Sequence, residues 1–329
     1  MKRRIKITAV SLIIFLVAEL IMITNVSAEQ IVLTHNEGQI IVDKNGNGDY
    51  KTIQEAINNV QPGSTVYVRK GEYSEIIEIK KQISLIGEDK DSTLINPISE
   101  KNKYAICLGA PGIKIQGLSI KNGAPGLYTS GIRVTSSKTE ISDCNIYDTP
   151  VGIAIWTSNN IIDNCNFWGC SDEGIVLLGS SYSECNNNKI TNCIFRDNCD
   201  GIELQYSSSN TITNCEFYDN THTGIDAIAS SNDKNIISNC RIYNNEVHGI
   251  YFSSSSENQI IDCSVYDNED GNIVMNKCSD DNQIISNSES SSEDNTASKR
   301  NILHYFLSRI SNHPHIQRIL SIFKCLTAF

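Results

Sequence analysis

The sequence predicts an all-β fold, a right-handed single-stranded parallel β-helix, in which the chain winds as a solenoid of short strands. A Gly-Ile pair recurs at steps of 21 to 27 residues, and a unit of that size must stack on copies of itself to bury its apolar face. The apolar runs hold only three to five residues and alternate with polar ones, which is the period of a strand. The repeats begin at Gly131, Gly152, Gly174, Gly201, Gly224, Gly249 and, as Asn-Ile, Asn272.

A second pattern, Ile-x-(Asn/Asp)-Cys-x-apolar, recurs within each repeat. Alternation places the cysteine and the apolar residue on one inward face, so like residues of successive coils should stack about 4.8 Å apart. We therefore expect these cysteines to be small core residues, although the spacing also permits disulfides between coils. The Asn or Asp before each cysteine tolerates left-handed backbone and predicts a bend. The cysteines are Cys144, Cys165, Cys193, Cys215, Cys240 and Cys263.

Three further cysteines, Cys170, Cys185 and Cys199, lie outside this register, in or near turns. They do not take part in the predicted column of core thiols. We expect these three to be the ones that pair in disulfides, as an exported chain permits.

Residues 1–28 are predicted to be a secretory signal. Four basic residues precede an apolar stretch from about Ile7 to Ile23, and small residues near Ala28 predict cleavage after it. An uncleaved anchor is the alternative, which Glu19 disfavours because a carboxylate within a membrane span is costly. In either case the remaining chain is expected to be secreted or held at the cell surface.

Residues 29–287 are assigned to the β-helix, which opens with a capping helix. Thr52-Ile-Gln-Glu55 is a capping-box pattern and predicts a short helix that ends near Val60. The helix would cover the open strand ends of the first coil. Strands 65–71, 76–79 and 83–86 are expected to form that coil, and residues 104–108 and 113–120 the second.

Two N-terminal segments resemble the opening of pectinesterase-like β-helix proteins. They are residues 42–57 and 66–75, and Gly71-x-Tyr73-x-Glu75 matches a signature of that family. The later repeats resemble the NosD-type, carbohydrate-binding and sugar-hydrolase β-helix repeats of surface proteins. Together these resemblances cover about residues 40–288 and imply the pectin-lyase-like fold, with Gly71-x-Tyr73-x-Glu75 in a structural role in the first coil.

The catalytic motifs of such families are incomplete here. The Gln-Asp pair and the Asp-Phe-x-Phe-Gly-Asn segment of pectinesterases are absent, as is the Arg-x-Pro-x-x-Arg pattern of pectate lyases. Of the polygalacturonase set only an isolated Asp280-Asp281 pair stands in a late repeat. Three Met and six His in the whole chain give little support to the copper binding that the NosD name suggests.

One outward face of the Gly-Ile strands combines aromatic, basic and acidic residues. Glu203 and Asp226 lie on adjacent coils with Cβ atoms about 5 Å apart, so they could share a proton, act as acid and base, or hold a cation. Trp156, Tyr251 and Arg133 would bind sugar on the same face. The alternative is a chance pairing of acids in a strongly acidic body. Further acids and histidines follow the same edge, namely Glu173, Asp200, His222 and His248.

A second outward column, three residues after each cysteine, is mostly aromatic and includes Tyr218 and Tyr243. Such rings suit sugar binding, and they equally suit stacking on one another for about 0.5–1.5 kcal/mol a pair. The next column could hold Ca²⁺, whose ligands are oxygens, or simply form solvated turns. No other cofactor and no other metal is indicated. The residues of this next column are Asp148, Asp197, Asp219, Asn244 and Asp267.

The C-terminal region divides into a polar linker, 288–298, and a short helical tail, 299–329. The tail carries +5 and reads as two basic amphipathic helices around His313-Pro314. It is expected to lie on a membrane, bind a partner protein or cap the last coil.

Charge limits the classes of partner. The total charge is −11, of which residues 1–28 contribute +3 and the tail +5, so the body carries −19 and should repel nucleic acid. We expect a monomer that binds or structurally organises polysaccharide at the cell surface. A polysaccharide-modifying enzyme (hydrolase, lyase or epimerase, pectinase-like) is the alternative, because this fold supports several chemistries.

Overall fold

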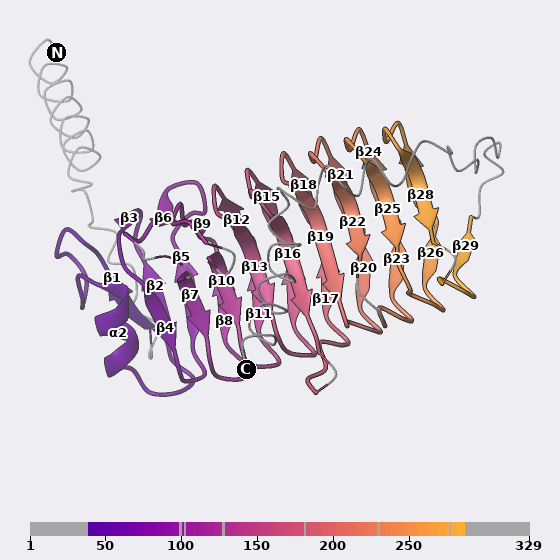
Figure 1. Cartoon of the computed structure of the whole chain (residues 1–329). Coiled ribbons are helices and arrows are strands. Elements are labelled where there is room, and N and C mark those ends of the chain that lie inside the picture. The colour runs from indigo at the N-terminus through magenta and orange to yellow at the C-terminus, as the bar shows by residue number, and fades with distance from the viewer. Residues whose placement is uncertain are drawn as a thin grey trace, which may run out of the picture. The chain divides into compact units, whose positions relative to one another are not determined.

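The computed structural model describes residues 39–286, except 99–100, 102, 127–128, 181, 229–230 and 277. Within these ranges the chain winds into coils of three short strands, and we use the word coil for one such turn (Figure 1). None of the helices in the described part is long and apolar enough to cross a membrane. The predicted signal segment 1–28, the linker 288–298 and the tail 299–329 lie outside the described residues.

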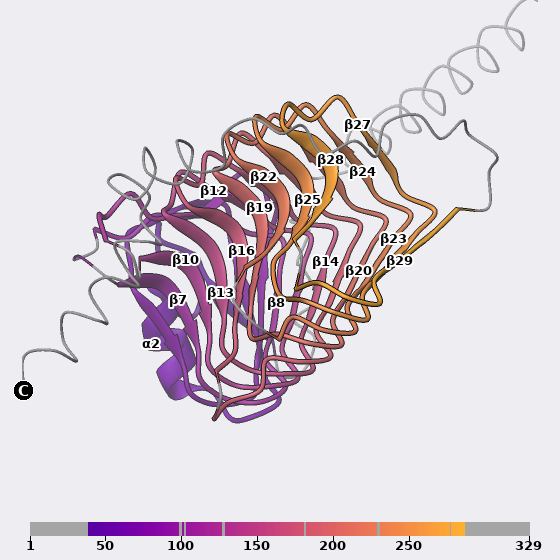
Figure 2. The ribbon, with the colours of Figure 1, turned by 45° about the vertical axis from the view of Figure 1, so that its right-hand side comes forward.

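The strands form three parallel sheets, because each strand pairs with the strand of like position one coil away (Figure 2). This arrangement confirms the predicted parallel β-helix. The first sheet contains β1 (Gln39–Val42), β2 (Thr65–Val68), β5 (Ser84–Gly87), β8 (Lys114–Gln116), β11 (Glu140–Ser142), β14 (Ile161–Asp163), β17 (Lys189–Thr191), β20 (Thr211–Thr213), β23 (Ile236–Ser238), β26 (Gln259–Ile261) and β29 (Gln283–Ile285).

The other two sheets complete each coil. The second sheet contains β3 (Gly71–Tyr73), β6 (Thr93–Ile95), β9 (Ser119–Lys121), β12 (Asn145–Tyr147), β15 (Asn166–Trp168), β18 (Ile194–Arg196), β21 (Glu216–Tyr218), β24 (Arg241–Tyr243) and β27 (Ser264–Tyr266). The third sheet contains β4 (Ile77–Ile79), β7 (Tyr104–Leu108), β10 (Ser130–Val134), β13 (Val151–Ile155), β16 (Glu173–Leu178), β19 (Asp200–Gln205), β22 (Thr223–Ala227), β25 (His248–Phe252) and β28 (Gly271–Met275).

The inward side chains form columns along the stack of coils. Phe167, Phe195 and Phe217 are fully buried, and successive rings stack with centroids 4.7 Å apart and planes within 4° of parallel. Each such pair contributes about 0.5–1.5 kcal/mol beyond the burial of the rings. Ile190 pairs in register with Ile212 on the next coil. The core is therefore built from like residues stacked on like residues, as the repeat predicts.

The repeat cysteines form one of these columns. The thiols of Cys193, Cys215 and Cys240 each donate to the backbone carbonyl two residues earlier, at 3.1, 3.3 and 3.3 Å. All of the repeat cysteines are free thiols, so the predicted core role is confirmed and the coils are not joined by disulfides at this column.

The pairing expected for the cysteines outside the register is wrong. Cys170 and Cys185 are buried free thiols, and neither is bonded to Cys199. Cys185 instead donates to the backbone carbonyl oxygens of Ile155 and Thr157 at 3.4 and 3.5 Å. These two carbonyls belong to the preceding coil, and the backbone N–H of Cys199 donates to the carbonyl of Cys170 at 3.0 Å although no disulfide joins the two residues.

The bends predicted before the repeat cysteines are confirmed. The Asn or Asp at that position has left-handed backbone with φ between 50° and 55°, in Asp143, Asn164, Asn192, Asn214, Asn239 and Asp262. Non-glycine residues rarely adopt this conformation, and Asn and Asp tolerate it best because their short side chains bond to the local backbone.

Two columns of buried asparagine, not identified from the sequence, line the remaining turns. Each side-chain N–H donates to the side-chain carbonyl of the asparagine on the next coil, and that carbonyl also accepts a backbone N–H from the first residue. Every buried amide group in the column thereby gains a partner. The columns are Asn160, Asn188, Asn210, Asn235, Asn258 and Asn282, and Asn198, Asn220, Asn245 and Asn268, of which Asn268 donates to Asn272 in its own coil.

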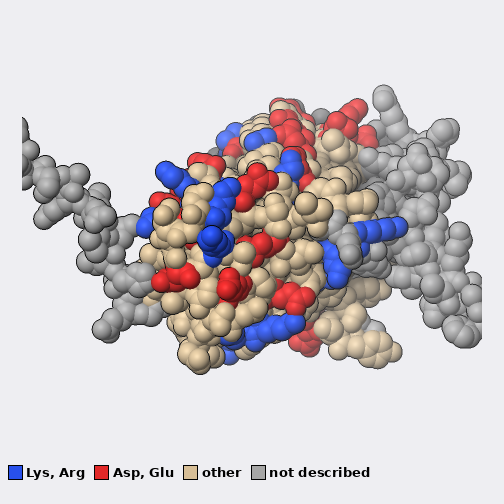
Figure 3. Space-filling model, turned by 90° about the vertical axis from the view of Figure 1, so that its left-hand side faces the viewer, with Lys and Arg blue, Asp and Glu red and all other residues tan. Residues whose placement is uncertain are grey.

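Helix α2 (Ile53–Asn59) covers the N-terminal end of the stack, as predicted (Figure 1). The predicted capping box is wrong, because Thr52 makes no side-chain cap hydrogen bond. The carboxylate of Glu75 caps the helix instead, accepting the backbone N–H groups of Ile53 and Gln54 at 2.8 and 2.9 Å. Acidic and basic side chains are interspersed on this end of the molecule (Figure 3).

The Gly71-x-Tyr73-x-Glu75 segment therefore has a structural role. Gly71 has φ 152°, a conformation that favours glycine, and the buried Tyr73 donates its hydroxyl to the carbonyl of Arg69 at 2.9 Å. Together with the cap that Glu75 provides, these contacts fix the first coil beneath α2.

The boundary of the first coil differs from the prediction. Ser84 of β5 pairs with Thr65 of β2, so residues 84–87 begin the second coil. Residues 113–120 likewise contain β8 and most of β9, which belong to the third coil. The Gly-Ile and cysteine patterns that fix the register downstream do not occur in this part of the chain.

Candidate functional site

The outer face of the third sheet carries the candidate site. In β19, Ile202 and Leu204 point into the core, and a Cβ on Gly201 would lie 2.6 Å from the ring of Phe217. Gly201 and Ile202 therefore both face inward, which leaves Asp200 and Glu203 together on the outer face.

Four carboxylates lie on this face in three successive coils. Glu173 pairs in register with Asp200, and Glu203 pairs with Asp226, as the sequence predicts. Their exposed fractions are 0% for the first three and 3% for Asp226. Burying carboxylates costs free energy. The fold itself does not require a carboxylate here, since Ala154 of β13 stands two coils earlier at the position of Glu203. Such clusters of ionisable groups are typical of functional sites.

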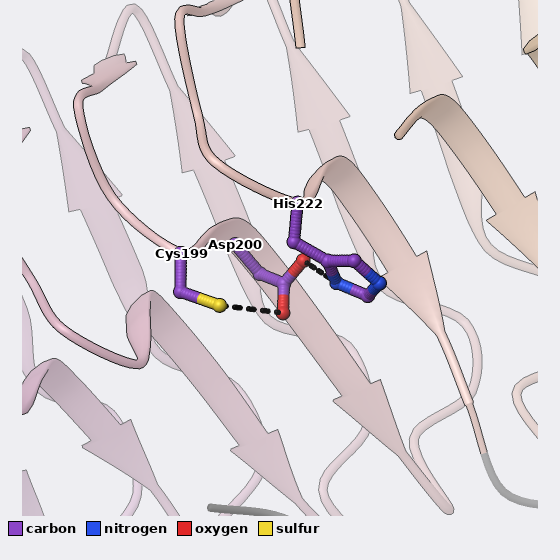
Figure 4. Close-up of side chains that lie close together, drawn as sticks. All are labelled: Cys199, Asp200 and His222. Atoms are coloured by element: carbon purple, nitrogen blue, oxygen red, sulfur yellow. Dashed lines mark hydrogen bonds and ion pairs between the residues drawn. The ribbon is translucent and has the colours of Figure 1, made fainter. Parts of the chain in front are cut away.

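His222 lies among these carboxylates, just before β22. Its Nδ1 is 2.6 Å from Oδ1 of Asp200 and 3.9 Å from Oδ2 of Asp226. Figure 4 shows the imidazole directed at the Asp200 carboxylate, with Cys199 on the other side of that carboxylate. The backbone N–H of Thr223 also donates to Oδ1 of Asp200 at 2.9 Å, which fixes the orientation of this carboxylate.

Cys199 completes a cluster of three donor types. Its Sγ is 4.0 Å from Oδ2 of Asp200, and the ligand atoms of Cys199, Asp200 and His222 all lie within 4.8 Å of one another. The sequence contains a signal for this cluster, because Cys199 and His222 each stand two residues before the glycine of their repeat. They therefore occupy the same position on adjacent coils, and the N–H of His222 donates to the carbonyl of Cys199.

One end of the face is apolar and cationic. The guanidinium of Arg133 lies 4.9 Å from the ring centroid of Tyr104 and 5.4 Å from that of Trp156. Burial lowers the pKa of Arg133 from its ordinary value. Trp156 packs against an apolar patch on the same outer face, formed by Val151, Ala154, Val176 and Leu178. The structure thus brings together the predicted residues Arg133 and Trp156.

The other end of the face is aromatic. Tyr251 pairs in register with Asp226, and its ring stacks on that of His248 with centroids 5.2 Å apart. Burial raises the pKa of the Tyr251 hydroxyl, and the charge of Asp226 adds to the shift. Trp156 and Tyr251 are separated by four coil steps, which is about 19 Å at the strand spacing.

Tyr218 and Tyr243 lie apart from this site, on the second sheet. Their rings stack with centroids 5.3 Å apart, and Tyr243 stacks in turn on Tyr266 at 5.2 Å. Burial and the hydrogen bond from its hydroxyl to Glu216 raise the pKa of Tyr243 to about 12. These rings stack on each other, which is the alternative that the sequence left open.

The column proposed for Ca²⁺ forms turns. Its five residues have left-handed backbone, with φ from 48° to 55°. The carboxylates of Asp148 and Asp197 are in ion pairs with Lys121 and Arg196, at 2.7 and 2.5 Å. These contacts support the turn interpretation over a calcium site.

Known proteins share both the sequence family and the fold. A family model described as "Right handed beta helix region" matches residues 83–234 and 200–303, and a model described as "Pectinesterase" matches residues 39–117. Pectinesterase/pectinesterase inhibitor 18 of Arabidopsis thaliana is 31% identical over 123 residues, which are 32% of this chain and 22% of that protein. A pectinesterase/pectinesterase inhibitor of Ficus pumila var. awkeotsang is 30% identical over 126 residues, 33% of this chain and 23% of that protein.

Solved structures show the same architecture. A rhamnogalacturonan lyase aligns with a TM-score of 0.57 and 13% identity, over 78% of this chain and 89% of that chain. The enzymatically active domain of tailspike protein 2 of bacteriophage CBA120 aligns with a TM-score of 0.53 and 14% identity, over 71% of this chain and 40% of that chain. At these identities the similarity shows the fold alone.

The match to pectinesterases is confined to part of each protein. The two curated relatives are matched over less than a quarter of their own length. The right-handed β-helix model, by contrast, spans more than half of this chain. The chain therefore belongs to the right-handed β-helix family.

Proposed function

We propose that the outer face of the third sheet, between β10 and β25, binds polysaccharide outside the cell. The observation that carries this proposal is the pair of partly exposed ends of the face, Arg133 with Trp156 at one end and Tyr251 at the other. Aromatic rings and a guanidinium provide flat surfaces for sugar rings. The predicted signal segment and the pectinesterase relatives support a polysaccharide ligand encountered outside the cell.

The shape of the face suits an extended ligand. Trp156 and Tyr251 are about 19 Å apart along the stack, so only a chain of several sugars could reach both. Trp156, Arg133 and Tyr251 are partly exposed, and they would contact the ligand directly. The acidic row would repel an anionic polysaccharide unless a cation stood between them, so a neutral or cationic polysaccharide fits best.

A polysaccharide-modifying enzyme is the second candidate, with Glu203 and Asp226 as acid and base. Their in-register pairing and the approach of His222 to Asp226 favour it, because closely spaced carboxylates divide into one that holds a proton and one that does not. The buried position of Glu203 counts against it, since a substrate must reach the catalytic group. We therefore place binding first.

The experiment is a glycan array with the whole chain, followed by affinity measurements on the polysaccharides retained. Trp156→Ala should weaken binding at least about tenfold, or about 1.4 kcal/mol. Trp168→Ala is the matched control, because Trp168 lies on the second sheet and stacks on Tyr147. Equal loss in both variants, or no retained polysaccharide at all, would contradict the proposed face.

The same polysaccharides decide between the two candidates. Reducing-sugar and unsaturated-product assays detect hydrolysis and elimination. Turnover that is lost in the Glu203→Gln, Asp226→Asn double variant, with binding retained, would favour the enzyme. Binding without turnover in the unaltered chain would favour the binding protein.

A further inference from the structure

Three side chains of different chemistry converge at one edge of the third sheet. Cys199 and Asp200 stand at the start of β19, and His222 stands one coil further, immediately before β22 (Figure 4). Their thiol, carboxylate and imidazole ligand atoms lie within 4.8 Å of one another. The regular stacking of the coils places them there, since Cys199 and His222 hold equivalent positions.

The separations are close to those around a tetrahedral metal ion. With bonds of about 2.0–2.3 Å to N, O and S, ligand atoms of such an ion lie about 3.3–3.7 Å apart. The Cys199 Sγ to Asp200 Oδ2 distance is 4.0 Å and the Asp200 Oδ1 to His222 Nδ1 distance is 2.6 Å. Shifts of well under 1 Å in side-chain position would bring both distances into that range.

The surroundings also suit a cation. Asp226 Oδ2 lies 3.9 Å from His222 Nδ1, near enough to provide a fourth ligand or to orient a bound water. Glu203 pairs in register with Asp226, so a divalent charge at the cluster would offset several buried carboxylates at once. The Thr223 N–H that donates to Asp200 would hold a ligating carboxylate in place, as partners outside the ligand set commonly do.

The donor set selects among metals. Thiolate and imidazole ligands suit Zn²⁺ and related transition metals, whereas Ca²⁺ and Mg²⁺ prefer oxygen. We propose that Cys199, Asp200 and His222 bind one divalent transition-metal ion of the Zn²⁺ type. Three protein ligands leave a fourth position for Asp226 or water, as in catalytic zinc sites.

Cobalt substitution tests the site without any polysaccharide. The whole chain, stripped of metal with a chelator, is titrated with Co²⁺ in a Cys278→Ser background, which removes the exposed cysteine of the described part. We expect one Co²⁺ per chain, with visible bands of a tetrahedral ion and a near-ultraviolet thiolate-to-cobalt band. Zn²⁺ should displace the Co²⁺ and abolish both signals.

Two variants assign the ligands. Cys199→Ser should remove the thiolate band and weaken Zn²⁺ binding at least about tenfold, and His222→Gln should weaken it similarly. Cys170→Ser is the matched control, since Cys170 is a buried thiol of the preceding coil that lies outside the cluster. Circular dichroism of each variant establishes that it is folded.

The outcomes separate this proposal from the proposed function. Absence of a thiolate band in the folded chain, or a band that survives Cys199→Ser, would overturn the metal site. Neither result bears on polysaccharide binding at Trp156 and Tyr251. Conversely, a chain that binds Zn²⁺ as described but retains no polysaccharide would leave the metal site standing and remove the proposed function.

Discussion

At the residue scale, the buried thiols act as small core side chains that can still donate a hydrogen bond to the backbone. Cys144 and Cys165 each donate to the carbonyl two residues earlier in the chain, at 3.2 and 3.3 Å. Burial raises the pKa of both thiols well above the ordinary value, because a thiolate would be desolvated there. The column is therefore held in the protonated form, which packs as a small hydrophobic side chain.

Cys185 gives this argument a measurable consequence. Burial raises its pKa from 9.0 to about 11. Below pH 9 the thiol is protonated in both folded and unfolded chains, so its contribution to stability is complete. Between pH 9 and 11 the unfolded chain loses the proton first, so the free energy of unfolding should fall as pH rises, by about 2 kcal/mol at pH 10.5 from this group alone.

Urea unfolding at pH 8 and pH 10.5 measures the effect. The fall in the free energy of unfolding between the two pH values should be smaller by about 2 kcal/mol in Cys185→Ala than in the unaltered chain. In Cys278→Ala, which alters an exposed cysteine, the fall should be unchanged. An identical fall in all three chains would show that Cys185 is not held protonated.

Single residues also show where sequence reasoning stopped. The register of Glu203 with Asp226 follows from the repeat alone, because equivalent positions on adjacent coils must pair. The contacts of His222 with Asp200 and Asp226 depend on side-chain rotamers. A repeat alignment fixes backbone position and leaves rotamers undetermined, so it indicated an acidic edge without revealing the three-donor cluster.

At the element scale, the turns of successive coils are hydrogen-bonded to one another, as the strands are. In the first asparagine column, Asn210 accepts the backbone N–H and the side-chain N–H of Asn188, and donates to Asn235. The column passes from coil to coil in the same way that strand pairing does. The sequence contains a signal for this column, because Asn188 and Asn210 each stand five residues before the cysteine of their repeat, although their distance from the Gly-Ile pair varies.

The cap on α2 was misassigned for a related reason. A capping box is a local pattern, and Thr52 with Glu55 satisfies it in the sequence. The carboxylate that caps the helix belongs to Glu75, about twenty residues later, and is brought there by the first coil. Only the folded coil determines that contact, so the existence of the helix was predictable and its cap was not.

The two glutamates provide a matched test. Glu75→Ala should lower the free energy of unfolding by about 1–2 kcal/mol, because two backbone N–H groups at the start of α2 lose their acceptor. Glu55→Ala should change it by less than about 0.5 kcal/mol, because Glu55 is exposed and its predicted box does not form. Chemical denaturation of both variants measures the difference. A larger loss of unfolding free energy in Glu55→Ala than in Glu75→Ala would show that the capping box forms after all.

At the scale of the whole molecule, stability is distributed along one axis. Each coil contacts mainly its neighbours, so stability is close to a sum of coil and interface contributions. The central strand β19 is buried almost throughout, whereas β28 is only partly buried and β29 is exposed. The N-terminal end differs, because α2 packs on the first strands and buries Ile53, Ala56 and Ile57.

This asymmetry predicts a gradient in local opening. Hydrogen exchange measured by mass spectrometry should show slow exchange in β16, β19 and β22, faster exchange in β25 and β28, and the fastest in β29. Strand β2, beneath α2, should remain as protected as the centre, because an end coil that is covered loses fewer contacts than one that is not. Rates are referred to those of the same peptides in the denatured chain. Uniform protection from β16 to β29 would mean that the coils open as a single cooperative unit, and fraying limited to β2 would mean that α2 does not stabilise its end of the stack.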